Sequence, residues 1–263
     1  MAPPMVSVVT VVFNGKEFIE RTLKSVLMQD YSNIEYIVID GGSTDGTLEI
    51  LRQYQPRLTY LSSEPDRGIY DAMNKGIAVA SGDWINFMNA GDEFVAVNTL
   101  STSIAQMHGG ESVFFGGVEI LYPDFCRTEN AGTPAKLWRG MQFCHQSSFI
   151  NLQYHKANPF NTANKIAADL EFFYSAQTKG VKFKNLNQII ASVITGGVSE
   201  KNRVRTLMAS CRAICGVRLH PIIRMYYGIR IVDSILRSMA KAVLPKAWVR
   251  KIMLSKGGLS GEQ

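Results

Sequence analysis

Three aspartates in this 263-residue chain stand where a carboxylate can do chemistry. Asp40 closes an apolar segment and precedes two glycines, so it can accept a hydrogen bond from a base or ribose that approaches the backbone there. Asp92 ends 88-MNAGD-92 and can bind Mg²⁺ or Mn²⁺, because phosphate oxygens and water supply the other ligands. Asp169, in 166-IAADLEFF-173, can act as a general base at the start of a helix.

Each aspartate also has a plainer interpretation. Beside Asp40, the glycines, serine and aspartate of 41-GGSTDGT-47 form a tight turn and a helix cap for backbone reasons alone. Asp92 follows Ala-Gly, which is typical of a turn, and the helix dipole favours a solvated acid at Asp169. The residue types alone leave these alternatives open.

Other polar residues are weaker candidates. Arg67 lies beside a glycine and can clamp a phosphate with two hydrogen bonds, although a loop arginine is also an ordinary surface residue. His145 and Gln146 precede an apolar segment, and no second histidine stands at metal-ligand spacing. The four cysteines have no CxxC pairing and predict reduced thiols in a cytoplasmic protein.

The elements that must position these residues alternate along the first third of the chain. The apolar run 6-VSVVTVVF-13 predicts a strand buried on both faces, and residues 14–29 then follow helical spacing. A second unit follows, with a strand over residues 34–40 and a helix from Thr47. Looser signals predict a strand at 58–63, a helix at 69–80 and a strand at 83–89.

This alternation predicts a mostly parallel sheet with helices on both faces. Ligands of such sheets bind outside the carboxyl ends of the strands. Phe13-Asn14, Asp40-Gly41-Gly42 and Asn89 to Asp92 all follow predicted strands, so we expect them to line one crevice. Farther along, the sequence predicts strands at 112–120 and 147–150, a loop or hairpin at 123–134 and a helix at 167–180.

The basic character of the chain is concentrated in its C-terminal part. Of the formal net charge of +6, residues 201–256 hold thirteen Lys and Arg against one acid, so the remainder carries about −6. Nucleic acid is therefore not an expected partner of the main domain. No run of about 18 apolar residues predicts a membrane span.

The ordered set of motifs resembles the family 2 glycosyltransferases with the GT-A fold, and more narrowly the bacterial exopolysaccharide enzymes of the colanic acid type. The resemblance covers roughly residues 5–200. It rests on 7-SVVTVVFN-14, 38-VIDGGSTDGT-47, 64-EPDRGIYDAMNKGIAVASGDWINFMNAGD-92, 145-HQSSF-149, 166-IAAD-169 and 196-GGVS-199.

The resemblance implies an α/β domain over residues 1–198 with a Rossmann-like, mostly parallel sheet flanked by helices, followed by a helical basic segment over 199–263. It implies a metal, Mn²⁺ or Mg²⁺, on Asp92 and a catalytic base at Asp169. It places His145 and Gln146 in the wall that holds the acceptor and the pyrophosphate. The residues it assigns to the donor nucleotide are Phe13, Asn14, Asp40, Gly41, Asp66, Arg67 and Asn89.

Two departures from the family pattern matter. Many members have consecutive aspartates where this chain has Asp40-Gly41, so the base of the donor stays open: a UDP-sugar is favoured and a GDP-sugar is the alternative. Asn89 and Gly91 replace acids of the fuller metal motif, which leaves Asp92 as its one carboxylate. The sub-family shares this reduced arrangement, so we interpret it as a minimal metal site.

The expected activity is transfer of a sugar, with inversion at the anomeric carbon, from a nucleoside-diphosphate donor to a saccharide acceptor in surface polysaccharide biosynthesis. The acceptor is expected to be lipid-linked. One alternative is a nucleotide-sugar-binding protein without catalysis. Another is a dinucleotide-dependent oxidoreductase, against which the absent GxGxxG turn argues.

Residues 217–253 interleave large apolar side chains with regularly spaced arginines and lysines. That composition is typical of an amphipathic helix on an anionic membrane surface. The alternative is a packed terminal helix with a solvated basic face. The first interpretation places the protein in the cytoplasm, bound peripherally to the inner face of the plasma membrane.

Overall fold

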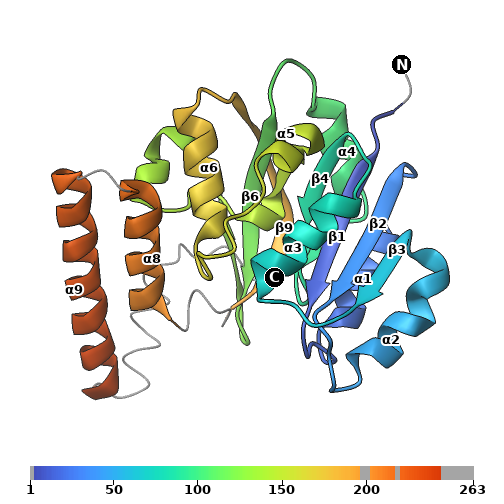
Figure 1. The fold of residues 1–263 in the computed structure, drawn as a ribbon, viewed down its shortest axis with the longest axis horizontal. Helices are drawn as coiled ribbons and strands as arrows, with labels where there is room; N and C mark the ends of the chain where they lie inside the picture. The colour runs from blue at the N-terminus through green and yellow to red at the C-terminus, as the bar shows by residue number, and fades with distance from the viewer. Residues whose placement is uncertain (1–2, 196–201, 217–219, 244–263) are drawn as a thin grey trace.

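The computed structural model describes residues 3–195, 202–216 and 220–243. One twisted sheet runs through the molecule, with helices on both faces and two further helices stacked beside it (Figure 1). The strands are β1 (Val6–Val12), β2 (Ile34–Asp40), β3 (Tyr60–Ser63), β4 (Trp84–Phe87), β5 (Glu93–Phe94), β6 (Val113–Leu121), β7 (Cys126–Glu129), β8 (Ser148–Asn151) and β9 (Phe183–Ile194). The helices are α1 (Ile19–Leu27), α2 (Thr47–Tyr54), α3 (Ile69–Val79), α4 (Thr99–Gln106), α5 (Leu152–Ala157), α6 (Ala168–Thr178), α8 (Arg203–Cys215) and α9 (Pro221–Val243), with short 3₁₀ turns η1 (Gln55–Arg57), η2 (Pro134–Arg139) and η3 (His145–Ser147).

The first half of the sheet is parallel, as predicted. Its strand order is β3-β2-β1-β4, and every residue of the central strand β1 is buried. The parallel register pairs Val12 with Asp40, so β1 and β2 end side by side. The residues that follow β1, β2 and β4 therefore share one edge of the sheet.

The second half of the sheet is mixed. β8 runs antiparallel to both β4 and β6, β9 is parallel to β6, and β5 adds an antiparallel strand beside β9. Signals in the sequence predict β6, β8 and α6, whereas α4, α5, β5 and β9 were not predicted. The fold class, a GT-A-like α/β sheet flanked by helices with a helical C-terminal extension, is confirmed.

Alternating residues of the buried strands feed two cores, one on each face of the sheet. Val9 and Val11 of β1 pack in the core beneath α3, α5 and α6. Val8 and Val12 of the same strand pack in the core beneath α1, α2 and α4. This two-sided burial explains why β1 reads as a continuous apolar run.

The predicted first helix begins later than its spacing indicated. Helical spacing starts at Asn14, but α1 begins at Ile19. Asn14 has a φ of 48°, and the Gly15 carbonyl accepts hydrogen bonds from the backbone N–H groups of Phe18 and Ile19. Residues 14–18 thus form a turn, which leaves them beside the ends of β1 and β2.

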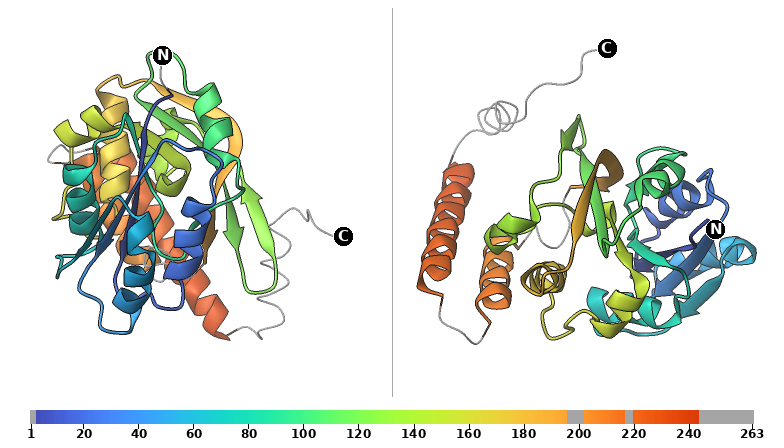
Figure 2. Two further views of the ribbon diagram at one scale, coloured as in Figure 1. Left: turned by 90° about the vertical axis from the view of Figure 1, so that its right-hand side faces the viewer. Right: turned by 90° about the horizontal axis from the view of Figure 1, so that it is seen from above.

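The helices α8 and α9 form a layer next to α6, away from the parallel half of the sheet (Figure 2). α8 packs on α6, and α9 packs on α8 and η2, with Tyr227 of α9 buried at the contact. Within the described residues no helix has the length and apolarity that crossing a membrane requires. The predicted boundary at 198/199, the motif 196-GGVS-199, and residues 217–219 and 244–263 of the basic segment lie outside the described residues.

Candidate active site

Three predicted donor residues meet at the edge of the sheet. A Cβ atom built on Gly41 would overlap the Asp66 carboxylate and lie 3.4 Å from Cδ2 of Phe13. The Phe13 ring is 64 % exposed although it directly follows a buried strand. An exposed aromatic ring, the backbone of Gly41 and a carboxylate therefore meet on one surface, and any residue larger than glycine at position 41 would collide with Asp66.

Asp40 lies beneath this surface with no exposed area. Its carboxylate accepts hydrogen bonds from the backbone N–H and hydroxyl of Ser43 and, at 2.6 Å, from the hydroxyl of Ser63. These bonds fix the turn after β2 to the end of β3. A nucleoside can reach the Asp40 carboxylate only if one of the two serines moves, so the described conformation assigns Asp40 to support of the turn.

Asn14 joins the ends of β1 and β2. Its backbone N–H donates to the Ser43 hydroxyl at 2.7 Å, and its side-chain oxygen accepts from the backbone N–H of Thr44 at 2.9 Å. The left-handed backbone at Asn14 is a conformation that asparagine adopts more readily than most residues. The residue therefore joins the two turns at the predicted donor crevice, beside the exposed ring of Phe13.

Arg67 lies on the surface beside this crevice. Its guanidinium is paired with Asp71 at 2.9 Å, and its side chain is 79 % exposed. Lys165 donates a 2.6 Å hydrogen bond to the Arg67 carbonyl, which ties this loop to the segment before α6. The Asp66 carboxylate accepts from the backbone N–H of Gly68 at 2.7 Å. To contact a phosphate, the Arg67 guanidinium must either leave Asp71 or bind Asp71 and the phosphate at the same time.

Five of the predicted residues form one hydrogen-bonded group although the sequence separates them widely. Gln146 donates to Asp92 at 2.7 Å, and its neighbour His145 bridges Asn89 on Nε2 at 2.9 Å and Asp169 on Nδ1 at 3.3 Å. The two consecutive residues of η3 thus connect the candidate metal residue with the candidate base.

Asp169 is held between three donors. In addition to His145, the phenol of Tyr70 donates to Asp169 at 3.0 Å and the backbone N–H of Leu170 donates at 2.8 Å. Burial raises the pKa of Asp169, but the hydrogen bonds and the attraction of His145 outweigh it, so its pKa lies below the usual value. The carboxylate is ionised at neutral pH. Burial and the Asp169 charge raise the pKa of Tyr70, which keeps its proton and remains a donor.

Asp92 has the opposite electrostatics. Burial raises the pKa of Asp92 to about 6, against the hydrogen bond from Gln146 and the attraction of His145 and Arg21. The adjacent Glu93 points elsewhere, because it forms an ion pair with Arg21. The carboxylate of Asp92 accepts a hydrogen bond, but within residues 3–195, 202–216 and 220–243 no basic side chain forms an ion pair with it, so its ionisation is unfavourable.

Asp92 fits a divalent cation only as a minimal site. Among the described residues no three His, Cys, Asp or Glu side chains are grouped as metal ligands. One carboxylate is sufficient when a bound diphosphate and water complete the coordination. The turn that presents Asp92 is fixed by Thr22, whose hydroxyl accepts from the backbone N–H of Gly91 at 2.9 Å and donates to the Asp92 carbonyl at 2.8 Å.

Two supporting residues were not predicted. Tyr70 reads as an ordinary core residue of an amphipathic helix, and its role follows only from its contact with Asp169. Asn86 is a fully buried amide inside β4 that donates to the carbonyls of Gln146 and Ser148 at 2.8 and 2.9 Å, and so holds η3 in place. An amide within the apolar strand 84-WINF-87 was a signal that the sequence offered.

Comparisons with known proteins find similar chains by sequence and by fold. Residues 7–164 match the model of the family described as glycosyl transferase family 2. An uncharacterised glycosyltransferase of Mycobacterium tuberculosis is 38% identical over 180 residues, which cover 66% of this chain and 69% of that protein. A PGL/p-HBAD biosynthesis glycosyltransferase of Mycobacterium bovis is 27% identical over 267 residues, covering 97% of this chain and 98% of the relative.

Solved structures share the fold at low sequence identity. The structure of residues 1–349 of Staphylococcus aureus TarS in complex with UDP-GlcNAc has a TM-score of 0.62 and 16% identity, covering 82% of this chain and 68% of that one. A mannosyltransferase of Pyrobaculum calidifontis in complex with GDP-Man and Mn²⁺ has a TM-score of 0.61 and 17% identity, covering 96% of this chain and 79% of that one.

Proposed function

Since the chain belongs to glycosyl transferase family 2, we propose that it is an inverting, metal-dependent glycosyltransferase that moves a sugar from a nucleoside-diphosphate donor to a saccharide acceptor. The hydrogen-bonded group that joins Asp92 to Asp169 through Gln146 and His145 is the observation that carries this proposal. This group contains two carboxylates with opposite pKa shifts. Asp92, whose pKa is raised, is suited to bind a cation, and Asp169, whose pKa is lowered, is ionised and suited to accept a proton.

The donor nucleotide binds at the carboxyl ends of β1 and β2. The base stacks on the exposed ring of Phe13, its edge approaches the bare backbone of Gly41, and Asp66 accepts from the ribose. Both UDP-sugars and GDP-sugars occur with solved neighbours of this fold, and a UDP-sugar is the donor that we favour for this chain. Arg67 would reach the diphosphate by exchanging its partner Asp71.

Asp169 takes the proton of the acceptor hydroxyl as that oxygen attacks the anomeric carbon. The carbon–oxygen bond to the diphosphate breaks on the opposite side, so the anomeric configuration inverts. His145 and Tyr70 hold the Asp169 carboxylate in one orientation, and the ionised state of Asp169 leaves it free to accept the proton. Because its pKa is depressed, the carboxylate gains basicity only as the acceptor displaces some of its donors.

Asp92 would hold the divalent cation, with Gln146 fixing the orientation of its carboxylate. When bound, Mn²⁺ or Mg²⁺ neutralises the charge that develops on the leaving diphosphate. Gln146 and the backbone of residues 89–92 shape the wall against which that diphosphate lies.

A transfer assay tests the proposal. Purified protein is incubated with a labelled UDP-sugar or GDP-sugar and with free and lipid-linked saccharides, and the anomeric configuration of the product is determined by NMR. We expect transfer with inverted configuration. A retained configuration would contradict the single-displacement chemistry, and nucleotide binding that is unaffected by Mn²⁺ and by Asp169→Ala would favour a binding protein without catalysis.

The charge of Asp92 predicts how the metal-free protein responds to pH. Its folded-state pKa of about 6 lies above the usual value of 3.8, so the folded chain binds this proton more tightly than the unfolded chain. The stability that it contributes is present below about pH 4 and is lost as pH rises through 6. At pH 7.5 in EDTA, Asp92→Asn is therefore expected to raise the free energy of unfolding by about 1 to 3 kcal/mol.

Urea unfolding at pH 5.0 and 7.5 measures this difference, with and without Mn²⁺. The gain from Asp92→Asn should shrink at pH 5.0, where the wild-type carboxyl is largely protonated, and should disappear when Mn²⁺ stabilises the wild type. Glu93→Gln is the matched control. It also removes one negative charge, but that charge is paired with Arg21, so the free energy of unfolding should not rise. An Asp92→Asn variant that is less stable than wild type at pH 7.5 in EDTA would show that the carboxylate is well compensated.

We further propose that α9 binds the inner membrane surface. Large apolar side chains recur along it at spacings of three and four residues, which places them on one face of the helix, and all are exposed. Arg224, Arg230 and Arg237 lie on the same helix and complement anionic headgroups. The apolar stripe consists of Ile222, Met225, Ile229, Val232, Leu236 and Met239.

Flotation with vesicles containing anionic lipid tests this surface. Ile229→Asp, in the centre of the stripe, is expected to weaken binding about tenfold or more, because it removes one buried apolar side chain and adds a negative charge. Ser238→Asp makes the same change of charge at an exposed position on the opposite side of the helix and should reduce binding much less. Equal effects of the two substitutions would mean that charge alone, and not the stripe, governs binding.

A further inference from the structure

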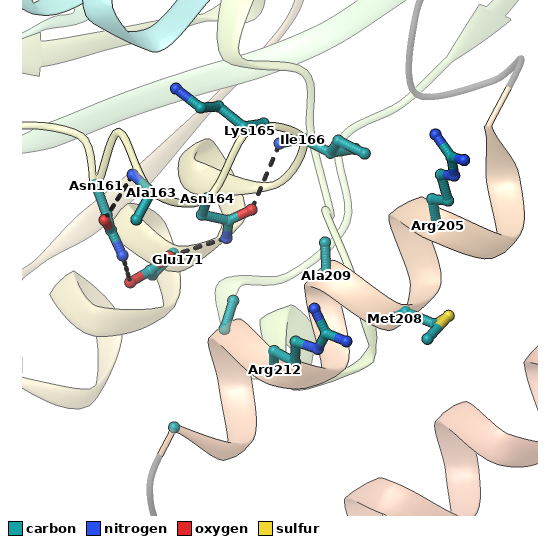
Figure 3. A pocket seen from close by; sticks show the side chains of 12 residues that line it. Asn161, Ala163, Asn164, Lys165, Ile166, Glu171, Arg205, Met208, Ala209 and Arg212 are labelled. Atoms are coloured by element: carbon teal, nitrogen blue, oxygen red, sulfur yellow. Dashed lines mark hydrogen bonds between the residues drawn. The ribbon is translucent and has the colours of Figure 1, made fainter.

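A cleft lies between the segment that leads into α6 and one face of α8 (Figure 3). Its volume is about 640 Å³, large enough for part of a saccharide or a diphosphate group. One wall is the segment Asn161 to Ile166, and the other is the face of α8 that carries Arg205, Ala209 and Arg212. The residues that line this cleft are separate from the hydrogen-bonded group around Asp92 and Asp169.

The cleft is positively charged. Arg205 and Arg212 are seven residues apart and lie on the same face of α8, about 10 Å apart along its axis. Within the described part of the chain neither guanidinium forms a salt bridge with an acid. Lys165 adds a third positive charge to the lining.

The one acid in the lining is already engaged. Glu171 accepts hydrogen bonds from the side chains of Asn161 and Asn164, each at 2.9 Å. Asn164 also accepts from the backbone N–H of Ala167 at 3.0 Å, which fixes the start of α6. The carboxylate of Glu171 thus shapes the wall of the cleft and leaves the two arginines of α8 to a ligand.

The wall of the cleft is also the wall of the catalytic group. The carbonyl of Ile166 accepts from the phenol of Tyr70 at 3.1 Å, and the same phenol donates to Asp169. On the donor side, Lys165 reaches the carbonyl of Arg67. Only the segment Asn161 to Ile166 therefore separates a ligand in the cleft from the base and from the donor loop. An acceptor has to reach both of them.

We propose that this cleft binds the phosphate or diphosphate group of the acceptor, with Arg205 and Arg212 as its ligands. Guanidinium groups pair with phosphate oxygens through two parallel hydrogen bonds, and the apolar floor between the arginines carries no competing acid. α9, which carries the apolar stripe, packs directly against α8. The inference rests on the proposed transferase function and specifies its acceptor as an anionic one.

Calorimetric titration with inorganic pyrophosphate in EDTA tests the cleft directly, since the donor site lacks its cation under these conditions. We expect binding that weakens about tenfold or more in each of Arg205→Gln and Arg212→Gln. Arg203→Gln, at an exposed position on the same helix that does not line the cleft, is the matched control and should bind like wild type. Thermal melts verify that the variants fold.

A second arm replaces pyrophosphate with farnesyl diphosphate. Tighter binding than pyrophosphate, still lost in the two arginine variants, supports the cleft and identifies a lipid-linked source of the phosphate. Equal binding, lost in the same variants, supports the cleft with a water-soluble phosphorylated acceptor. Absence of pyrophosphate binding, or an equal loss in Arg203→Gln, would overturn the assignment.

Titration of the same variants with UDP and Mn²⁺ separates this inference from the function that it rests on. We expect Arg205→Gln and Arg212→Gln to keep wild-type affinity for UDP. If wild type binds UDP with Mn²⁺ but no pyrophosphate in EDTA, the cleft assignment is wrong and the transferase proposal stands. If wild type binds no nucleotide under any condition, the transferase proposal fails independently of the cleft.

Discussion

Replacing Asp169 with asparagine is expected to lower kcat by about 10²- to 10⁴-fold, the usual contribution of a general base. Asparagine preserves the shape of the side chain and can still accept from Tyr70 and from the backbone N–H of Leu170. It cannot take a proton from the acceptor hydroxyl. Single-turnover measurements with saturating donor isolate this effect, and nucleotide affinity should change little.

The neighbouring His145 provides the decisive comparison, because its ring lies beside Asp169 and could itself accept the proton of the acceptor hydroxyl. His145→Gln keeps a hydrogen-bond donor near Asp169 and is expected to cost only about tenfold in kcat, less than loss of the base itself. An equal or larger loss in His145→Gln would identify the histidine as the proton acceptor and Asp169 as the group that orients it.

Tyr70→Phe tests through the pH profile whether Tyr70 acts on Asp169, because a purely structural role would leave that profile unshifted. The phenol is one of the groups that lower the pKa of Asp169, so its removal should raise that pKa. The acid limb of the pH profile of kcat/KM is therefore expected to shift to higher pH, while the maximal rate falls only modestly. An unshifted limb would mean that the titrating group is not Asp169.

The parallel half of the fold was predictable because each of its signals is local. β1 and β2 are buried on both faces and read as continuous apolar runs, and α3 carries its apolar residues at helical spacing. β9 was missed for the opposite reason. Its sequence FKNLNQIIASVI begins with polar residues, and its place beside β6 depends on a pairing partner some seventy residues earlier in the chain.

The candidate site shows the same division. Its residues were predicted one by one from turns and from the family resemblance, and no pattern in the sequence joins Asn89 with His145 across 56 positions or His145 with Asp169 across 24. For Arg67, the family resemblance pointed to a phosphate contact and left out a local partner. Its i,i+4 spacing to Asp71 was visible in the sequence, and the two residues do form an ion pair.

The electrostatics of the two aspartates argue against a binding protein that has lost its chemistry. Hydrogen bonds from three separate elements hold Asp169 ionised, and among the described residues no basic side chain forms an ion pair with Asp92. Because the pKa of Asp92 is raised, removal of this charge would relieve a cost to folding if the charge had no use. Two carboxylates with shifted pKa values in one hydrogen-bonded group are typical of catalytic sites.

Donor binding is expected to depend on the cation and on Asp92 together. In calorimetric titrations with UDP and with GDP, one nucleotide should bind in Mn²⁺ and lose about 100-fold or more in affinity in EDTA, and Asp92→Asn should reproduce that loss in Mn²⁺. The reason is that Asp92 pairs with no basic side chain in the part of the chain that the structure describes, whereas the adjacent Glu93 is held by Arg21. Glu93→Gln is the control and should retain cation-dependent binding. Binding that is equal in Mn²⁺ and EDTA, and unchanged by Asp92→Asn, would reduce Asp92 to a turn residue and require a cation-independent way of stabilising the leaving diphosphate, for which the exposed guanidinium of Arg67 is the nearest candidate.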